Sequence, residues 1–309
     1  MKKPILSVKN LEISFSQYTK ALKRKNIRVI NDLNIDLYEG EILAVVGSSG
    51  SGKSLLAHAI LDILPENASI SGEIIYKDEI LDSKKIESLR KTDISFVPQS
   101  VNYLDPLMKV SSQVKIAVED KAKKNILQRK IFDKYNLDEE VDDYYPHQLS
   151  GGMARKVLLA NALVKKCSVL ILDEPTPGLD EISLNEVLKD LEEVKKSNCA
   201  VLMITHDIEA ALKIADKIAV FYAGTTLEVA DINDFTDEDK LRHPYSKALY
   251  RSLPQNSFEP IKGSQPLTSE NIDGCLFYDR CDLRDDKCSK KIPDVRNLRD
   301  GMVRCIHAT

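Results

Sequence analysis

The sequence predicts an α/β fold that begins with an antiparallel pair of strands and ends in a small cysteine-rich tail. Residues 5–13 and 29–37 each alternate apolar with polar residues, which is typical of half-buried strands. From residue 41 the pattern changes to short, wholly apolar strands followed by helical segments, as in a parallel sheet covered by helices. Beyond about residue 231 this alternation stops, and four of the six cysteines lie in the last 35 residues.

The individual elements are expected in the following order. The two strands at residues 5–13 and 29–37 are joined by a basic loop over residues 20–28. Five short, mainly apolar strands follow, at residues 42–46, 94–97, 169–172, 200–204 and 218–221. Residues 111–166 contain no strand candidate and are expected to form a helical insertion. A helix is predicted over residues 181–196 because apolar residues recur at three- and four-residue steps: Leu184, Val187, Leu188, Leu191 and Val194.

Length and composition exclude several classes of protein. The 309 residues, 43% of them hydrophobic and 30% charged, are those of a globular chain and not of collagen, a coiled coil or a disordered protein. The formal net charge of −4 argues against a nucleic-acid partner. The longest apolar stretches are far shorter than the roughly 20 residues that span a bilayer. Because the start also lacks the apolar run of a signal peptide, we expect a cytoplasmic chain whose cysteines are reduced or metal-bound.

A phosphate-binding loop is predicted directly after the strand at residues 42–46. The loop has the pattern GxxxxGKS and consists of Gly47, Ser48, Ser49, Gly50, Ser51, Gly52, Lys53 and Ser54. Its glycines allow a tight turn, and its backbone N–H groups face phosphate oxygens at the start of a helix. Lys53 neutralises the β- and γ-phosphates, and Ser54 supplies a Mg²⁺ ligand. The alternative is a plain glycine-rich turn, but the order strand, loop, helix favours a phosphate site.

Two carboxylates end the strand at residues 169–172. Asp173 is placed to hold Mg²⁺, and Glu174 to orient and polarise an attacking water. Acidic residues at strand ends are also common as solubilising caps, so the pair gains its weight from the phosphate loop upstream.

Further motifs make the chain similar to the ATP-binding cassette family. Residues 149–153, LSGGM, resemble the LSGGQ signature with Met153 in the final position. Gln99 in FVPQ resembles the Q-loop, residues 177–180 the D-loop, and His206 in ITHD the switch histidine. The resemblance covers residues 5–230 and implies a RecA-like P-loop core with an antiparallel β subdomain and a helical subdomain at about residues 99–166. It divides the chain into an ATP-binding domain, residues 1–235, and a C-terminal extension, residues 236–309.

The resemblance also implies roles in a composite ATP site. In the family two cassettes sandwich ATP head to tail, so the signature of one chain, here Ser150, Gly151 and Gly152, completes the site of its partner. Glu174 is then the general base, His206 the γ-phosphate sensor, and Gln99 a ligand that links Mg²⁺ and the attacking water to the helical insertion. Lys53 contacts phosphate, and Asp180 of the D-loop belongs to the nucleotide site. Taken singly, His206 and Asp180 are equally consistent with helix caps, and Gln99 with a surface amide.

An aromatic side chain is expected to stack on the adenine. Phe15 is the first candidate, because it lies before the strand pair as in NLxxxF. A buried core aromatic is an alternative interpretation of Phe15, and Tyr18 is a rival for the adenine.

The tail narrows the resemblance. Two segments resemble the ATPase subunits of oligopeptide, dipeptide and nickel importers: residues 101–110, and residues 243–250, of which the second begins with His-Pro-Tyr. Four cysteines follow in the spacing C-x5-C-x6-C-x16-C, namely Cys275, Cys281, Cys288 and Cys305. The tail is too poor in apolar residues to hold a core alone, so we expect a metal to hold it together. Similar tails resemble iron–sulfur sites, and four thiolates suit a 4Fe–4S cluster; zinc is the alternative, and unligated cysteines remain a third.

Together these resemblances imply an ATP-hydrolysing subunit of an importer at the cytoplasmic face of the membrane. Its expected partners are two transmembrane permease subunits, contacted through residues 102–118, and a second, homologous ATPase subunit in a heterodimer. A substrate-binding protein outside the cell acts indirectly. Peptides are the first expected substrate, and nickel, free or with a metallophore, is the alternative. A soluble non-transport ATPase is a further alternative, although the sequence has no second cassette, long coiled coil or basic surface.

Overall fold

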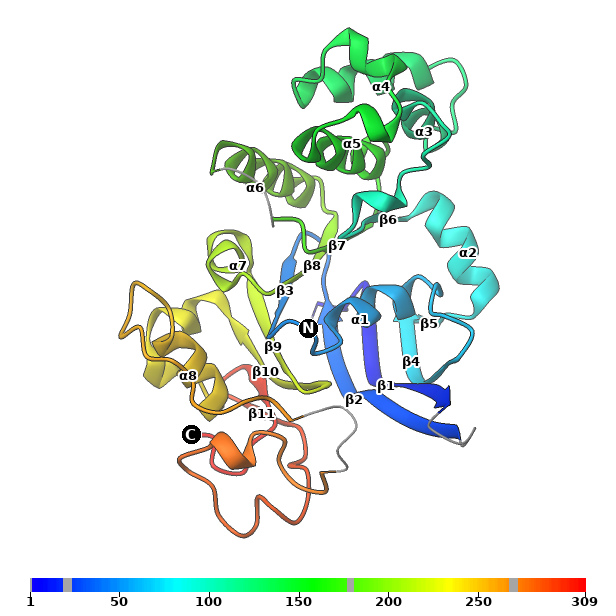
Figure 1. The fold of residues 1–309 in the computed structure, drawn as a ribbon. Helices are drawn as coiled ribbons and strands as arrows, with labels where there is room; N and C mark the ends of the chain where they lie inside the picture. Colours follow the sequence, from blue (N-terminus) through cyan, green and yellow to red (C-terminus); the bar gives the residue numbers. More distant parts are fainter. Residues whose placement is uncertain (1, 19–23, 177–180, 267–271) are drawn as a thin grey trace.

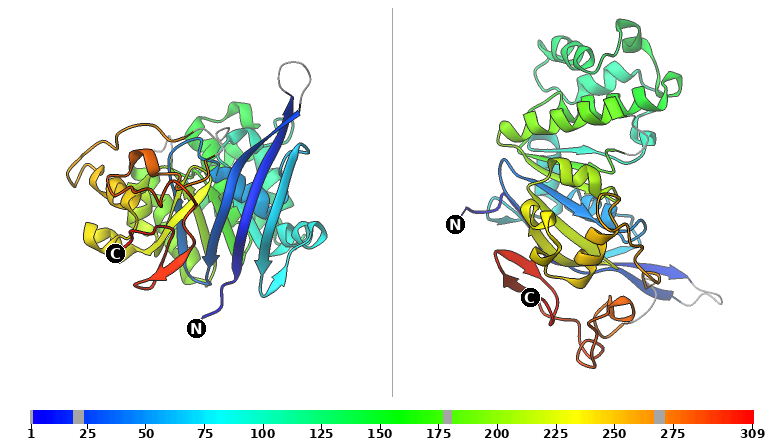
Figure 2. Two further views of the ribbon diagram at one scale, coloured as in Figure 1. Left: turned by 90° about the horizontal axis from the view of Figure 1, so that it is seen from below. Right: turned by 90° about the vertical axis from the view of Figure 1, so that its left-hand side faces the viewer.

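Two β-sheets organise the protein. The computed structural model describes residues 2–18, 24–176, 181–266 and 272–309. In these residues a four-stranded antiparallel sheet has the order β2-β1-β4-β5 and an eight-stranded mixed sheet the order β11-β12-β10-β9-β3-β8-β7-β6 (Figure 1). The helical insertion and the cysteine-rich tail lie at opposite ends of the molecule (Figure 1; Figure 2). The predicted α/β class is confirmed.

The antiparallel sheet begins with the two strands predicted at the N-terminus, β1 (Leu6–Tyr18) and β2 (Arg24–Leu37). Both are longer than predicted. The sheet also contains β4 (Ala68–Tyr76) and β5 (Glu79–Ile80), which the analysis missed because most of β4 is exposed and shows no apolar alternation. The buried face of this sheet packs against the helix that follows the phosphate loop, α1 (Lys53–Ile60).

The five predicted core strands are confirmed and form a parallel unit. They are β3 (Ile42–Val46), β6 (Ile94–Val97), β7 (Val169–Asp173), β8 (Ala200–Thr205) and β9 (Lys217–Tyr222). Alternate residues of β3 belong to different core clusters: Leu43 and Val45 pack with α1, whereas Ala44 and Val46 pack with the helices of the other face. Because both faces are covered, the strands need few polar positions, which explains their mainly apolar sequences.

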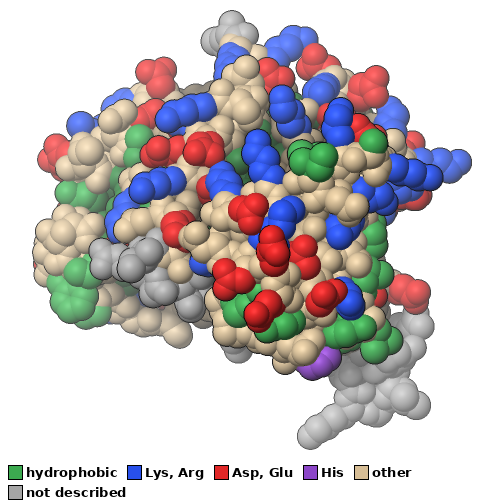
Figure 3. Space-filling view, turned by 90° about the horizontal axis from the view of Figure 1, so that it is seen from above, with side chains coloured by type: hydrophobic (Ala, Val, Ile, Leu, Met, Phe, Trp, Pro, Cys, Tyr) green, Lys and Arg blue, Asp and Glu red, His purple; other side chains and the backbone are tan. Residues whose placement is uncertain are grey.

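Helices cover the second face of this sheet and build a separate lobe. The predicted helix at 181–196 is α6 (Glu181–Lys196), and α7 (Ile208–Ile214) lies beside it. A further helix, α2 (Ser83–Thr92), precedes β6. The lobe consists of α3 (Val110–Ile116), α4 (Lys124–Lys134) and α5 (Gly151–Leu163), with no described strand between Ser111 and Lys166, as predicted. Acidic and basic side chains are interspersed over the top of this lobe (Figure 3).

The predicted C-terminal extension is joined to the main sheet. The strand β10 (Thr225–Asp231) pairs with β9, and two short tail strands, β11 (Arg296–Leu298) and β12 (Gly301–Val303), continue the same sheet. The tail helix α8 (Pro244–Arg251) packs its Tyr245 ring against Tyr222 of β9. Strands of three residues carry no detectable periodicity, which is why this continuity was missed. The boundary near residue 235 stays a prediction.

Among the described residues, no helix combines the length and the apolar content that spanning a membrane requires.

Candidate functional site

The phosphate loop is shaped by its glycines and closed by its lysine. A Cβ at Gly47 would lie 2.2 Å from the carbonyl oxygen of Phe221, so no larger residue fits there. Gly50 and Gly52 have φ of 75° and 95°, a region that favours glycine. Lys53 is buried, and its Nζ donates to the carbonyl oxygens of Gly47 and Ser48, both at 2.9 Å. Burial lowers the pKa of Lys53, while the nearby Glu174 and Asp173 oppose this shift.

The two oxygens predicted to hold Mg²⁺ lie side by side. Ser54 is in the first turn of α1 and Asp173 ends β7, and Ser54 Oγ donates to Asp173 Oδ1 at 3.0 Å. Burial raises the pKa of Asp173, and the hydrogen bond from Ser54 opposes this change. A hydroxyl and a carboxylate at this separation are hard oxygen ligands of the kind that Mg²⁺ prefers.

The predicted base and the predicted switch residue are in direct contact. His206 Nδ1 donates to Glu174 Oε2 at 2.8 Å, and Thr205 Oγ1 donates to the same oxygen at 3.3 Å. The Glu174 backbone has φ of 50°, and its N–H donates to Ile204 of β8 at 2.8 Å. This conformation is costly for a residue other than glycine, and its persistence shows that the surroundings hold Glu174 in place. A buried carboxylate with one imidazole partner is arranged to accept a proton or to orient water.

An arginine that the sequence analysis missed ties three motifs together. Arg155 of α5 is only 6% exposed, and it donates to the carbonyl oxygens of Gln99 at 2.8 Å, Pro98 at 3.1 Å and Pro175 at 3.3 Å. Burial lowers the pKa of this guanidinium, and the nearby Asp173 opposes the shift. Arg155 follows the buried Ala154 and lies within the apolar stripe of α5. A charged residue at such a position was a detectable signal of a structural role, because charged residues are rarely buried without partners. The side chain of Gln99 itself is exposed.

The signature residues begin a helix in the lobe, as predicted. Ser150 is the N-cap of α5, and its Oγ accepts a hydrogen bond from the N–H of Met153 at 3.3 Å. Ser150, Gly151 and Gly152 are exposed, and a Cβ at either glycine would meet nothing within 4 Å. This leaves the start of α5 open to a second chain. Their role in a partner's site stays a prediction.

The remaining nucleotide predictions are only partly visible. Phe15 is half-buried on β1 and packs against the core under the antiparallel sheet. Asp180 and the side chain of Tyr18 lie outside the described part of the chain. The choice of the aromatic that stacks on adenine therefore stays a prediction.

The four tail cysteines line one small cavity. All four are buried free thiols, and all four line this cavity: Cys275, Cys281, Cys288 and Cys305. The N–H of Cys275 donates to the carbonyl of Cys288 at 2.7 Å, which joins two of the loops that carry them. Burial raises the pKa of Cys275 to about 11, and the other three thiols add to this shift. A bound cation would reverse it, because metal binding deprotonates thiols. The donor set fits a centre with four thiolates.

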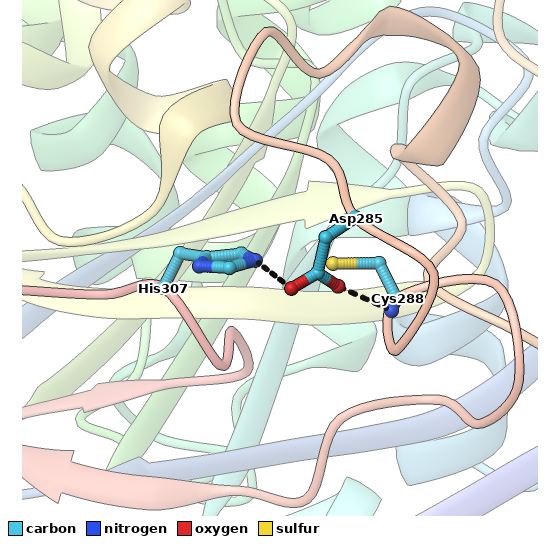
Figure 4. A group of neighbouring side chains, drawn as sticks. All are labelled: Asp285, Cys288 and His307. Atoms are coloured by element: carbon cyan, nitrogen blue, oxygen red, sulfur yellow. Dashed lines mark hydrogen bonds and ion pairs between the residues drawn. The ribbon is translucent and has the colours of Figure 1, made fainter.

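One of these cysteines also belongs to a mixed group that the sequence analysis missed. Asp285, Cys288 and His307 hold possible ligand atoms within 4.8 Å of one another (Figure 4). His307 Nε2 lies 3.3 Å from Asp285 Oδ2, and Asp285 Oδ1 accepts from the N–H of Cys288 at 3.1 Å. The carboxylate thus fixes the loop of Cys288 from outside the cavity.

The fold and the phosphate site define a P-loop ATPase. The family model described as ABC transporter matches residues 30–177, and the one described as oligopeptide/dipeptide transporter, C-terminal region, matches residues 227–288. The chain belongs to the ABC transporter family, among the members with this C-terminal region.

Named relatives match almost the whole chain. It is 32% identical to the dipeptide transport ATP-binding protein DppD of Bacillus subtilis (strain 168), with 94% of this chain and 90% of the relative covered. It is 33% identical to the oligopeptide transport ATP-binding protein OppD of Escherichia coli (strain K12), with 97% and 92% covered. A solved bacterial ABC transporter cassette, MJ0796, has a TM-score of 0.64 at 23% identity over 74% of this chain and 98% of that one, which shows the fold.

Proposed function

We propose that this chain is the ATP-hydrolysing subunit that powers import of dipeptides or oligopeptides through partner permeases. One observation carries the proposal: the same chain contains both the site around Glu174 and His206 and the C-terminal region matched at residues 227–288. The names of the relatives, which transport dipeptides or oligopeptides, support peptides as the cargo.

Each side chain of the site has a task in this function. The loop at residues 47–54 and Lys53 bind the phosphates, and the adjacent oxygens of Ser54 and Asp173 bind Mg²⁺, with Gln99 as a further ligand. Mg²⁺ supplies charge neutralisation at the transferred phosphate when bound. Glu174 orients and polarises the attacking water, and His206 holds the Glu174 carboxylate through the 2.8 Å contact.

A groove beside the helical lobe is the proposed permease contact. It has a volume of about 600 Å³, and its lining includes Tyr103, Met108 and Ile116, of which Tyr103 and Ile116 are 53% and 71% exposed. The Gln113 side chain bonds to Asp105 and Met108 at 2.9 Å and keeps this loop rigid. A groove lined by both apolar and charged side chains suits a short amphipathic permease helix.

Movement at this groove has a path to the ATP site. The loop beside the groove begins at Gln99. Arg155 donates hydrogen bonds to the carbonyl oxygens of Gln99 and of Pro175, the residue after Glu174. A permease helix that shifts Tyr103 would therefore move the backbone next to the predicted base, Glu174. Ile116→Glu should abolish co-purification with the permeases while leaving ATP affinity unchanged, and Ile126→Glu, at an exposed apolar position of α4, is the control.

The proposed assembly has two permeases and two cassettes at the cytoplasmic face of the membrane. The exposed Ser150, Gly151 and Gly152 would complete the site of a second, homologous ATPase, with an extracellular binding protein delivering cargo. The purified chain alone should therefore bind ATP and hydrolyse it slowly.

The four-cysteine cavity is proposed to hold a 4Fe–4S cluster, with zinc as the alternative. The burial of all four thiols around one cavity supports a metal centre. Anaerobic absorption with iron, zinc and sulfide analysis separates the two, and Cys281→Ser should remove the signal. One zinc without sulfide would replace the cluster by a structural zinc site.

Transport itself is tested by uptake in cells that lack their own copy of this chain. The wild-type chain should restore uptake of a radiolabelled dipeptide, whereas Glu174→Gln should not. Glu192→Gln, an exposed glutamate of α6, is the matched control and should restore uptake. Restored uptake of nickel without that of the dipeptide would overturn peptides as the cargo.

A further inference from the structure

The histidine of the His-Pro-Tyr motif is locked in one orientation. His243 is the N-cap of α8, and its Nδ1 accepts a hydrogen bond from the N–H of Tyr245 at 2.9 Å. Its own backbone N–H donates to Glu228 Oε2 of β10 at 2.8 Å. An imidazole nitrogen that accepts a hydrogen bond carries no proton, so the proton of a neutral ring is on Nε2.

This Nε2–H group is buried without a partner. The residue is 1% exposed, and within the described part of the chain no acceptor lies within hydrogen-bond distance of Nε2. Burial lowers the pKa of His243 to about 3, so the ring is neutral at physiological pH. Leaving a buried donor unpaired is unfavourable, and the great majority of buried polar groups are paired. The geometry therefore calls for an acceptor that the protein alone does not supply.

The missing acceptor belongs in the cysteine cavity. His243 lines this cavity together with the four cysteines, and the ring of Phe277 lies edge-on to the imidazole with 6.0 Å between centroids. A neutral thiol is a weak acceptor, whereas a metal-bound thiolate or a bridging sulfide is anionic and accepts well. Filling the cavity with a metal centre would create such an acceptor beside His243.

We propose that His243 Nε2 donates a hydrogen bond to an anionic sulfur of the metal centre held by Cys275, Cys281, Cys288 and Cys305. This inference rests on the metal centre of the proposed function and adds a residue outside the ligand set. Hydrogen bonds to metal-bound sulfur stabilise the reduced, more negatively charged state of a redox centre and slow loss of the metal.

The same residue joins the metal centre to the edge of the ATPase sheet. Glu228, which holds the His243 backbone, is fully buried, and its Oε1 accepts from Arg242 N–H at 2.9 Å and from the Arg242 guanidinium at 3.2 Å. Glu228 also pairs with Val303 of β12, two residues before Cys305. The motif thus has a physical task on each side: its backbone is anchored to β10, and His243 lines the cavity of the cysteines.

Two substitutions separate the two nitrogens of the ring. In His243→Asn the side-chain oxygen takes the place of Nδ1 and keeps the helix cap, but no donor reaches the position of Nε2. In His243→Gln the longer amide returns an N–H group near Nε2. His147→Asn, at an exposed histidine of the helical lobe, is the control.

The experiment compares the purified full-length variants under anaerobic conditions. We measure iron, zinc and sulfide content, the midpoint potential of the centre by dye-mediated titration, and the rate of metal release to a chelator. His243→Asn should bind metal, shift the potential to more negative values and release metal several-fold faster, and His243→Gln should restore both properties at least in part. If the centre is zinc, which has no redox change, the release rate alone carries the comparison.

The outcomes distinguish this inference from the proposal beneath it. A wild-type chain without metal overturns both the metal centre and the hydrogen bond. A metal-loaded wild-type chain with unchanged potential and release rate in His243→Asn overturns the hydrogen bond only. If His243→Asn fails to fold, a His307→Gln chain labelled with ¹⁵N-histidine decides an iron–sulfur centre, since His307 also lines the cavity. The reduced cluster should show a weak nitrogen coupling from His243, and its absence refutes the contact. For zinc, a release rate in His243→Gln equal to the wild-type rate supports the contact, and a rate several-fold faster refutes it.

Discussion

Removal of the Arg155 side chain should weaken the fold and the hydrolysis step together. Arg155 makes three hydrogen bonds to carbonyl groups, those of Gln99, Pro98 and Pro175, at 2.8, 3.1 and 3.3 Å. A hydrogen bond with a charged donor contributes about 1.5–3 kcal/mol, so the two shorter bonds give about 3–6 kcal/mol. Burial of the guanidinium, which lowers its pKa, offsets part of this gain. We expect Arg155→Ala to lower the free energy of unfolding by about 2–4 kcal/mol.

Thermal unfolding and ATP turnover measure this effect. For a chain of this size the loss corresponds to a fall in melting temperature of roughly 3–6 °C. ATP binding to the phosphate loop should change little, because the hydrogen bonds of Arg155 within the described residues do not involve residues 47–54. Hydrolysis by the assembled transporter should fall about tenfold or more, since Gln99 and the segment after Glu174 lose a shared anchor.

The neighbouring Lys156 provides the control. It lies on the same helix, is partly exposed, and makes a long ion pair of 3.8 Å with Glu186. Lys156→Ala should change stability by less than about 0.5 kcal/mol. A melting temperature of Arg155→Ala within a degree of that of Lys156→Ala would refute the stabilising role of the three hydrogen bonds. Normal hydrolysis in a strongly destabilised Arg155→Ala would refute their role in the hydrolysis step.

Three other substitutions or modifications have expected outcomes. Glu174→Gln should bind ATP normally but hydrolyse it roughly 10²- to 10⁴-fold more slowly in a phosphate-release assay; normal turnover would exclude it as the base. Gly47→Ala should weaken ATP binding about tenfold or more by calorimetry, since its Cβ would lie 2.2 Å from the Phe221 carbonyl oxygen, and unaltered affinity would show that the loop can shift. Cys167, which accepts from Cys199 at 3.6 Å, has its pKa lowered to about 7. Because the thiolate reacts, alkylation at Cys167 followed by mass spectrometry should reach half its maximal rate near pH 7, and a midpoint near 9 would contradict this.

The core strands and the phosphate loop were predictable because their signals are local. A fully buried parallel strand such as β3 is apolar at every position, and GxxxxGKS is contiguous. The contact between Glu174 and His206 could only be expected from resemblance, because it joins residues that follow two neighbouring strands, β7 and β8. Its detail, a left-handed backbone at Glu174, has no counterpart in composition or periodicity.

The missed features depend on contacts between distant segments. Arg155 acts on carbonyl groups that follow β6 and β7, and backbone acceptors leave no trace in the sequence. Two tail strands, β11 and β12, are too short for a periodic pattern and exist because β10 offers them an edge. The unpaired Nε2 of His243 likewise emerges only when burial and partners are known.

The continuation of the main sheet into the tail also affects self-association. Without β11 and β12, the strand β10 would form the outer edge of the sheet, and its backbone around Glu228 and Val229 would lose the partner that β12 provides. Such an edge is a template for intermolecular strand pairing. The last residues of the chain therefore act as a guard against aggregation. A chain shortened before residue 296, or one whose tail has come loose, would be expected to precipitate before any catalytic defect could be measured.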